Sequence, residues 1–177
     1  DIKPTKEITP INNSDNNVNY KHLKETMLIR AKNTLAEATK NNLNIEINTW
    51  KKINDYTFDV NNGYLACELL DGTPRASSNK SLIISYEHSS TLKRMSDHFQ
   101  KLTTFYSEIS NSNKKISFIE DSDWENLKKE YIMLLKSGKK MEITDEPTEE
   151  PKKGKTESSN ESFLRAKELF GDLVEIR

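Results

Sequence analysis

The run Ser81-Leu82-Ile83-Ile84-Ser85-Tyr86 decides the fold class. β-Branched and aromatic residues favour strands, and turn-forming residues bound the run, so it predicts a short strand. From Ser89 or Ser90 onward, apolar residues recur every three or four positions, which predicts a helix whose wide apolar stripe packs on the sheet. The stripe consists of Leu92, Met95, Phe99, Leu102, Phe105 or Tyr106, and Ile109.

A second strand and a closing helix follow in the sequence. Residues 115–119 alternate polar and apolar side chains as a strand does, and Ser122-Asp123-Trp124-Glu125 is a capping-box signature for a helix start. The expected buried face of that helix is Trp124, Leu127, Tyr131, Leu134 and Leu135. Short strands set among helices predict an α+β fold, in which a small β-sheet is packed by a long helix.

Two or three helices are expected before the first strand. The first starts near Val18, and the third spans about Asn61 to Leu70 and ends at Gly72 and Pro74. We expect Cys67, in the third helix, to be a small buried hydrophobe. The apolar faces of the three are Leu23, Met27, Ala31, Leu35 and Ala38; Leu43, Ile47, Trp50 and Ile53 or Asn54; and Leu65, Cys67, Leu69 and Leu70.

Composition predicts one folded domain between polar segments. Only 33% of the 177 residues are hydrophobic, too few for a chain that is compact throughout. Residues 1–17 have two prolines and no apolar period, so we expect a linker there. The globular α+β interaction domain is expected at 18–137, a disordered tether at 138–160 and a C-terminal docking peptide at 161–177.

Charge and residue counts argue against several classes of protein. A formal net charge of -1 disfavours binding of nucleic acid through bulk charge, and one cysteine with three histidines makes a metal site improbable. The chain has no Gly-x-x-x-x-Gly-Lys-Ser/Thr loop and no apolar run of membrane-spanning length. We therefore expect a cytoplasmic, non-enzymatic protein without catalytic residues, metal, cofactor or membrane partner.

Charged and aromatic side chains that invite a catalytic interpretation have simpler explanations. Glu120, Asp121, Asp123 and Glu125 are candidates for paired acid and base, but they coincide with a helix start, where capping is the expected role. His22, His88 and His98 are expected to be solvated or capping residues. Trp50 and Trp124 lie in apolar helical registers and are expected in the core.

Five basic residues are candidates for a nucleic-acid-binding patch. Three of them lie on the predicted long helix and two precede the second strand, and a solvated helix face is the alternative interpretation. The set is Lys93, Arg94, Lys101, Lys114 and Lys115.

The C-terminal segment has an apolar pattern of its own. Phe163, Ala166, Leu169 and Phe170 share one helical face, and Gly171 suits the residue after a helix end. Isolated helices this short are marginal in water, so we expect this one to order by docking on another protein. The alternative is that it folds back on its own domain.

The end of the sequence resembles the closing motif of tau subunits of DNA polymerase III from low-GC Gram-positive bacteria. The matching residues are Ala166-Lys167-Glu168-Leu169-Phe170-Gly171-Asp172-Leu173-Val174-Glu175-Ile176. A second resemblance, in order and spacing, is to the domain that precedes this motif in the family. It rests on residues 35–39, Trp50, the strand at 82–86, the helix around Phe99, and Trp124.

The resemblance implies a variant, truncated KH-like domain that tethers the replicative DNA polymerase to the clamp loader during DNA replication. It also implies the replicative helicase as a second candidate partner, and contact with other clamp-loader subunits through upstream domains. DNA contact would be weak or indirect. The polymerase-binding residues carried over from the motif and its helical face are Phe163, Leu164, Ala166, Leu169, Phe170, Gly171, Leu173, Val174 and Ile176.

A KH-like module that binds single-stranded nucleic acid is the alternative function. Such domains clamp the phosphate backbone with a Gly-x-x-Gly loop. None of the five glycines here forms that pattern, which disfavours this alternative.

Overall fold

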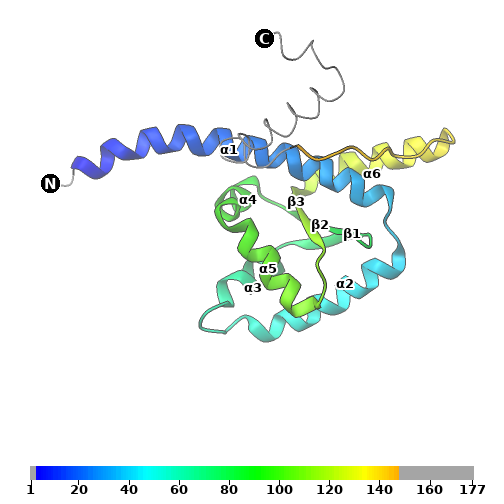
Figure 1. Ribbon diagram of the computed structural model, residues 1–177, viewed down its shortest axis with the longest axis horizontal. Helices are drawn as coiled ribbons and strands as arrows, with labels where there is room; N and C mark the ends of the chain where they lie inside the picture. Colours follow the sequence, from blue (N-terminus) through cyan, green and yellow to red (C-terminus); the bar gives the residue numbers. More distant parts are fainter. Residues whose placement is uncertain (1–2, 148–177) are drawn as a thin grey trace, which may run out of the picture. The chain divides into compact units, whose positions relative to one another are not determined.

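The computed structural model describes residues 3–147, with side chains from Tyr20 onward, and residues 1–145 form one compact unit. The fold is α+β, as predicted (Figure 1). In order, its elements are α1 (Lys3–Ala36), α2 (Lys40–Ile53), the 3-10 turn η1 (Asn54–Tyr56), α3 (Gly63–Leu70), β1 (Thr73–Ser77), β2 (Ser81–Tyr86), α4 (Ser89–Met95), the 3-10 turn η2 (Ser96–His98), α5 (Phe99–Ser110), β3 (Lys115–Glu120) and α6 (Asp121–Lys136).

The sheet is mixed, and β2 is its central strand. β1 pairs with β2 antiparallel, and β3 pairs with β2 parallel, with Ile84 opposite Phe118. A parallel pair needs a long crossover between its strands, and α4, η2 and α5 provide it. All six residues of β2 are buried, because helices cover both faces of the sheet.

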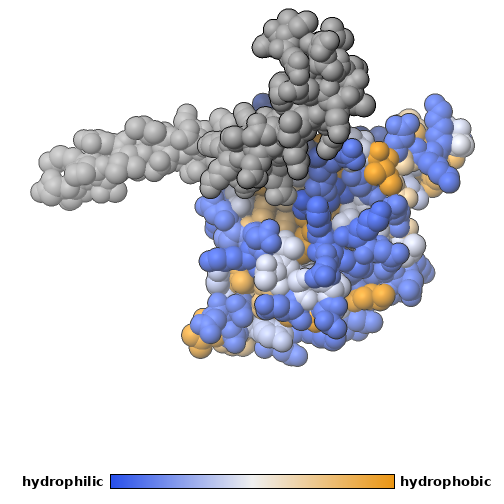
Figure 2. Space-filling model, viewed as in Figure 1, coloured by the Kyte–Doolittle hydropathy of each residue, from blue (hydrophilic) through white to orange (hydrophobic). Residues whose placement is uncertain are grey.

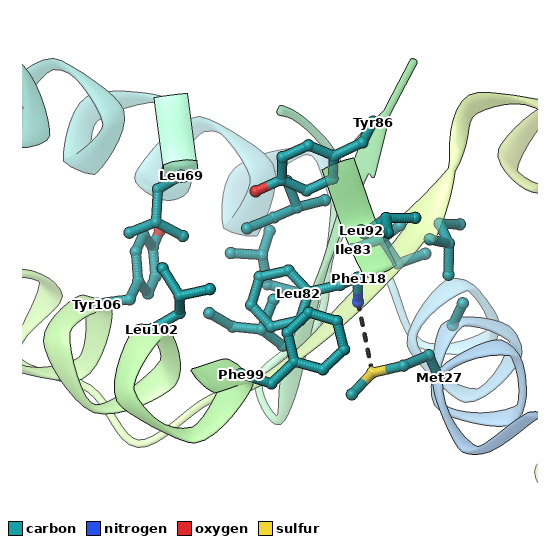
Figure 3. Packing of buried hydrophobic residues seen from close by; sticks show 14 of the residues in the cluster. Met27, Leu69, Leu82, Ile83, Tyr86, Leu92, Phe99, Leu102, Tyr106 and Phe118 are labelled. Atoms are coloured by element: carbon teal, nitrogen blue, oxygen red, sulfur yellow. Dashed lines mark hydrogen bonds between the residues drawn. The ribbon is translucent and has the colours of Figure 1, made fainter. Parts of the chain in front are cut away.

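The two faces of β2 differ in chemistry. Leu82, Ile84 and Tyr86 alternate with Ser81, Ile83 and Ser85, so one face is apolar apart from the Tyr86 hydroxyl and the other carries two serine hydroxyls. Figure 3 shows Leu69, Leu102 and Tyr106 on the apolar side and Met27 of α1 on the opposite side. On the apolar side the rings of Phe99 and Phe118 stack with centroids 4.5 Å apart.

Hydrogen bonds, as well as apolar contacts, join α1 to the sheet. Buried Arg30 donates to the Ile116 carbonyl at 2.7 Å, and Ser117 Oγ donates to the Met27 carbonyl at 2.5 Å. Thr34 and Ser81 share a buried hydroxyl–hydroxyl hydrogen bond. Each serine on this face is therefore paired, which removes the cost of burying it.

Several expected boundaries differ from those observed. α1 begins at Lys3, so residues 3–17, expected as a linker, are helical. Residues 138–145 belong to the compact unit rather than to a tether: Met141 is buried, and Thr144 exchanges two hydrogen bonds with Asn33 of α1. Residues 148–160 lie outside the described part of the chain.

Strand β1 occupies residues 73–77 and so begins directly after Gly72 and includes Pro74, the two residues predicted to end the third helix. It tolerates Pro74 because β1 is an edge strand, and the pairing register shifts between Pro74 and Ala76. The predicted long helix from 89 to 109 is interrupted by η2, where His98 leaves the helical conformation and its ring hydrogen-bonds Glu68 Oε1 at 2.5 Å. Its apolar stripe is still buried from Leu92 to Tyr106.

Three side chains do not follow the predicted faces. Cys67 is exposed, because Leu65, Ala66 and Leu69 set the buried face of α3 and residue 67 lies away from it. Ile47 is also exposed, since α2 buries Glu46, Thr49 and Ile53 instead. Leu135 is exposed near the end of α6, where the helix extends past the side chains that cover Trp124 and Leu127.

Candidate functional site

The segment from Asn54 to Tyr64, here called the exposed loop, holds large apolar side chains in solvent. Phe58 is 97% exposed and Val60 is 95% exposed. Tyr56 and Tyr64, at either side of them, are 38% and 49% exposed. Figure 2 shows hydrophobic residues at the lower left, where Figure 1 places the connection between α2 and α3. Burying one such side chain stabilises by about 1.5–3 kcal/mol, so two left in solvent call for an explanation.

Hydrogen bonds hold the backbone of the exposed loop. Asp59 Oδ2 accepts from the amides of Asn61 at 3.1 Å and Asn62 at 2.7 Å, and the Asp59 carbonyl accepts from Gly63 at 2.9 Å. A Cβ at Gly63 would lie 2.8 Å from the Thr57 carbonyl oxygen, so no other residue fits there without a backbone shift. The loop is thus folded in a way that presents Phe58 and Val60 outward.

Aromatic contacts fix both ends of the exposed loop to the domain. The Tyr56 ring meets Phe105 of α5 edge to face at 5.6 Å, and the Tyr64 ring meets His98 at 5.7 Å. Beside them lies an open depression of about 410 Å³. Its walls are Asn61, Asn62, Tyr64, Leu65, Gln100, Lys101, Thr104, Phe105 and Glu108.

Sequence reasoning missed this surface. Phe58-Asp59-Val60 follows the end of a predicted helix and has no helical period of its own. The sequence therefore assigns Phe58 and Val60 to no helix face. The signal that was present is the pair of large apolar residues inside a stretch rich in Asp, Asn and Gly. Such stretches form turns, and an apolar side chain at a turn is often exposed.

The predicted polymerase-binding residues, from Phe163 to Ile176, lie outside the described part of the chain. Their role therefore stays a prediction from the sequence.

The five basic candidates do not form one patch. Lys93 and Arg94 lie in α4, before the start of α5, and Lys101 lies in the first turn of α5, whereas Lys114 and Lys115 follow the end of α5. A helix of 12 residues spans about 18 Å, which separates the two pairs. Lys114 is also unsuited to contact nucleic acid, because its side chain is only 10% exposed and its ammonium lies 2.5 Å from Glu46 Oε2.

The acidic cluster at residues 120–125 caps α6 as expected, but the predicted capping box of Ser122 and Glu125 is wrong, because the helix begins at Asp121 and Glu125 pairs with Lys128. The Glu120 side chain and the Asp123 side chain form a capping box at the helix start. Lys24 of α1 pairs with Glu120 at 3.2 Å, and Arg75 pairs with Asp121 at 3.4 Å. The hydrogen bond to Glu120 raises the pKa of the Lys24 ammonium. These carboxylates join elements to one another and leave no open acid–base pair.

A buried polar cluster, here called the Glu46 cluster, joins α2, α5, β1 and the residue before β3. Glu46 is 1% exposed and accepts hydrogen bonds from Tyr106 Oη, from Ser77 Oγ at 3.0 Å and from the Lys114 ammonium. Burial raises the pKa of the Tyr106 hydroxyl, and the adjacent Glu46 carboxylate raises it further. Every polar group in the cluster has a partner, so its role is structural.

Residues 3–147 contain neither a metal-binding cluster nor a membrane-spanning helix. Among them, no three His, Cys, Asp or Glu side chains are grouped so as to hold a metal ion. None of the helices in this range combines the length and apolarity required to cross a bilayer.

Comparison with known proteins identifies no relative of this chain. No protein-family model matches it, and neither the curated proteins nor the solved structures contain a significant match.

Proposed function

We propose that this chain is a non-catalytic protein-interaction module. One observation carries the proposal: the exposed loop holds Phe58 and Val60 almost fully in solvent on a hydrogen-bonded backbone. A loop that is already ordered loses little entropy on binding, and apolar anchors that enter a pocket of a partner dominate interface energy. The two side chains contribute nothing to the domain's own core, so a partner is the simplest explanation.

The charged and nucleophilic side chains of the described residues support a non-catalytic role. Glu46, Glu68 and Asp121 are each paired with a neighbour inside the domain. The depression beside the exposed loop is lined by amide, hydroxyl and apolar groups together with the charged side chains of Lys101 and Glu108.

The particular partner in this proposal is the replicative DNA polymerase, which the module would tether to the clamp loader in the cytoplasm. Support comes from the resemblance of residues 166–176 to the tau closing motif. Two separate contacts, one by the C-terminal segment and one by the exposed loop, would combine through effective concentration. The attachment would then be firm overall although each contact is modest.

A titration of the purified replicative polymerase tests both contacts. The intact chain is compared with a chain lacking residues 162–177 and with the double variant Phe58→Ser, Val60→Ser. We expect each change to weaken binding by about tenfold or more, because each removes buried apolar anchors. Binding is measured by calorimetry or by fluorescence anisotropy of a labelled chain.

The matched control is Ile45→Ser, which removes an exposed apolar side chain of α2 that is 49% exposed and lies outside the loop. It should bind as the intact chain does. If the truncated chain and the loop variant both bind unchanged, the proposed function is wrong. If the chain instead binds single-stranded DNA with a steep dependence on salt and independently of residues 162–177, the nucleic-acid alternative replaces it.

A further inference from the structure

The last two turns of α6 expose a second surface, which we call the lysine–aliphatic face. Ile132 is 44% exposed, Met133 is 63% exposed and Leu135 is 52% exposed. Figure 2 shows hydrophobic residues among hydrophilic ones at the right of the view, where α6 lies in Figure 1. The face consists of Lys128, Lys129, Ile132, Met133, Leu135 and Lys136, all of them exposed.

The fold itself does not require apolar residues on this face. α6 packs on the domain through Trp124 and Leu127, which are buried, and through Leu134, which is partly buried. Ile132 and Met133 point away from that side of the helix. Polar residues would keep the same helix and the same core.

The charge around the lysine–aliphatic face is strongly positive. Within residues 20–147, neither Lys129 nor Lys136 makes an ion pair, and the exposed Lys139 and Lys140 follow directly after the helix. Two acids of α6 are already engaged, since Glu125 pairs with Lys128 at 3.3 Å and Glu130 pairs with Lys32 at 3.4 Å. Glu142 lines a groove at this end of α6, but the four lysines 129, 136, 139 and 140 outnumber it, so the surface favours a ligand with negative charge.

The same end of α6 also borders a concave surface, to which the helix contributes Glu130 and Leu134 rather than residues of the face. A groove of about 590 Å³ runs between α1, the end of α6 and the segment that follows it. The two hydrogen bonds between Asn33 and Thr144 hold that segment against α1 and so keep the groove open. Its lining is Lys32, Glu130, Leu134, Lys139, Lys140, Met141, Glu142 and Thr144.

We propose that the lysine–aliphatic face and its groove bind an acidic amphipathic helix of a partner protein. The aliphatic side chains would meet the apolar face of that helix, and the lysines would meet carboxylates along its edges. A helix side chain can enter the groove, whereas a flat lipid surface cannot. Three half-exposed aliphatic residues also offer little area to insert into a bilayer. This inference is independent of the proposed function, because it uses no residue of the exposed loop or the C-terminal segment.

The test uses a synthetic helical peptide as the probe. The peptide carries leucines at positions i, i+3, i+4 and i+7 over four turns with glutamates elsewhere, and its binding to the full chain is followed by fluorescence anisotropy. Comparison probes are a scrambled peptide of the same composition, a peptide with lysine in place of every glutamate, and vesicles of phosphatidylserine and phosphatidylcholine.

We expect the acidic amphipathic peptide to bind at least tenfold more tightly than the scrambled and basic peptides, with partial weakening at high salt. The variant Ile132→Ser, Met133→Ser and the variant Lys129→Glu, Lys136→Glu should each lose about tenfold in affinity. The control Lys51→Glu, Lys52→Glu makes the same charge change on exposed residues of α2 and should bind normally. Circular dichroism establishes that each variant is folded.

Three results would overturn the inference. Equal binding of the amphipathic acidic peptide and its scrambled version would mean that charge alone accounts for the affinity. Binding to the anionic vesicles without binding to the peptide would assign the face to a lipid surface. Unchanged peptide affinity in both face variants would place the binding site elsewhere.

Discussion

Glu46 shows how one residue can decide the arrangement of several elements. An isolated carboxylate in a protein interior is costly, and here three donors from three other parts of the chain surround it. All three hydrogen bonds to the Glu46 carboxylate can form only when α2, α5, β1 and Lys114 lie where they are observed. We infer that the Glu46 cluster specifies how these parts pack, while apolar burial supplies most of the stability.

Replacing Glu46 tests this inference. Glu46→Ala leaves the Lys114 ammonium buried without its carboxylate, so we expect the free energy of unfolding to fall by about 3–5 kcal/mol. The double variant Glu46→Met, Lys114→Met removes both charges and should recover most of the loss. Urea unfolding followed by the fluorescence of Trp50 and Trp124 measures both.

Glu87→Ala is the control, because Glu87 is an exposed glutamate and its loss should change stability by less than about 0.5 kcal/mol. A Glu46→Ala effect as small as the control's would show that the buried cluster is dispensable.

At the level of the elements, the turn between α3 and β1 packs directly against β2. A Cβ at Gly72 would lie 2.5 Å from Ile84 Cγ2 and 2.6 Å from the Tyr86 ring. The Tyr86 hydroxyl also donates to the Glu68 carbonyl at 2.9 Å, so the ring has no freedom to move away. The absence of a side chain at Gly72 lets the chain turn directly into the edge strand.

Gly72→Ala should therefore destabilise the domain by about 1–3 kcal/mol through overpacking. The comparison is Gly138→Asn, at a left-handed position with φ of 76° and no atom near the added Cβ. Asparagine tolerates that conformation, so this variant should stay near the original stability. The two variants are compared by thermal unfolding. Equal melting temperatures would contradict the prediction that a side chain at Gly72 overpacks the sheet.

For the whole molecule, the buried tyrosines should make the free energy of unfolding fall as the pH becomes alkaline. Burial raises the pKa of the Tyr86 and Tyr106 hydroxyls above the ordinary tyrosine value, so the folded protein keeps protons that the unfolded chain loses above about pH 10. Their contribution is fully present below that pH and is lost as the pH rises further. The smaller upward pKa shifts of Tyr20 and Lys24 act in the same direction.

We expect the free energy of unfolding to fall by about 2 kcal/mol between pH 10 and pH 11, and by about 2.7 kcal/mol per pH unit once the unfolded tyrosines are fully ionised, with about half from each of Tyr86 and Tyr106. Tyr106→Phe should reduce the slope by about half while lowering stability at pH 7. Urea unfolding between pH 9 and pH 11 measures the slope. A flat profile, or a slope that the Phe variant leaves unchanged, would contradict the assignment.

Local patterns in the sequence determined which elements form, because helix and strand periods reflect burial along a single segment. The α+β class, the strands at 81–86 and 115–120, the buried stripe from Leu92 to Tyr106 and the capping role of Asp123 all followed from such patterns. The edge strand β1 was missed because Pro74 is a local signal against a strand, and only its pairing with β2 overrides that signal.

Tertiary structure alone decided which side chains meet and which stay exposed. Glu46 is buried and Ile47 is exposed because partners for the carboxylate come from residues 31 to 68 positions away, which no local period records. Phe58, Val60 and the lysine–aliphatic face are likewise exposed because no other element covers them. The apolar content of a sequence predicts burial on average, but the solvent exposure that makes an apolar residue available for binding is a property of the assembled fold.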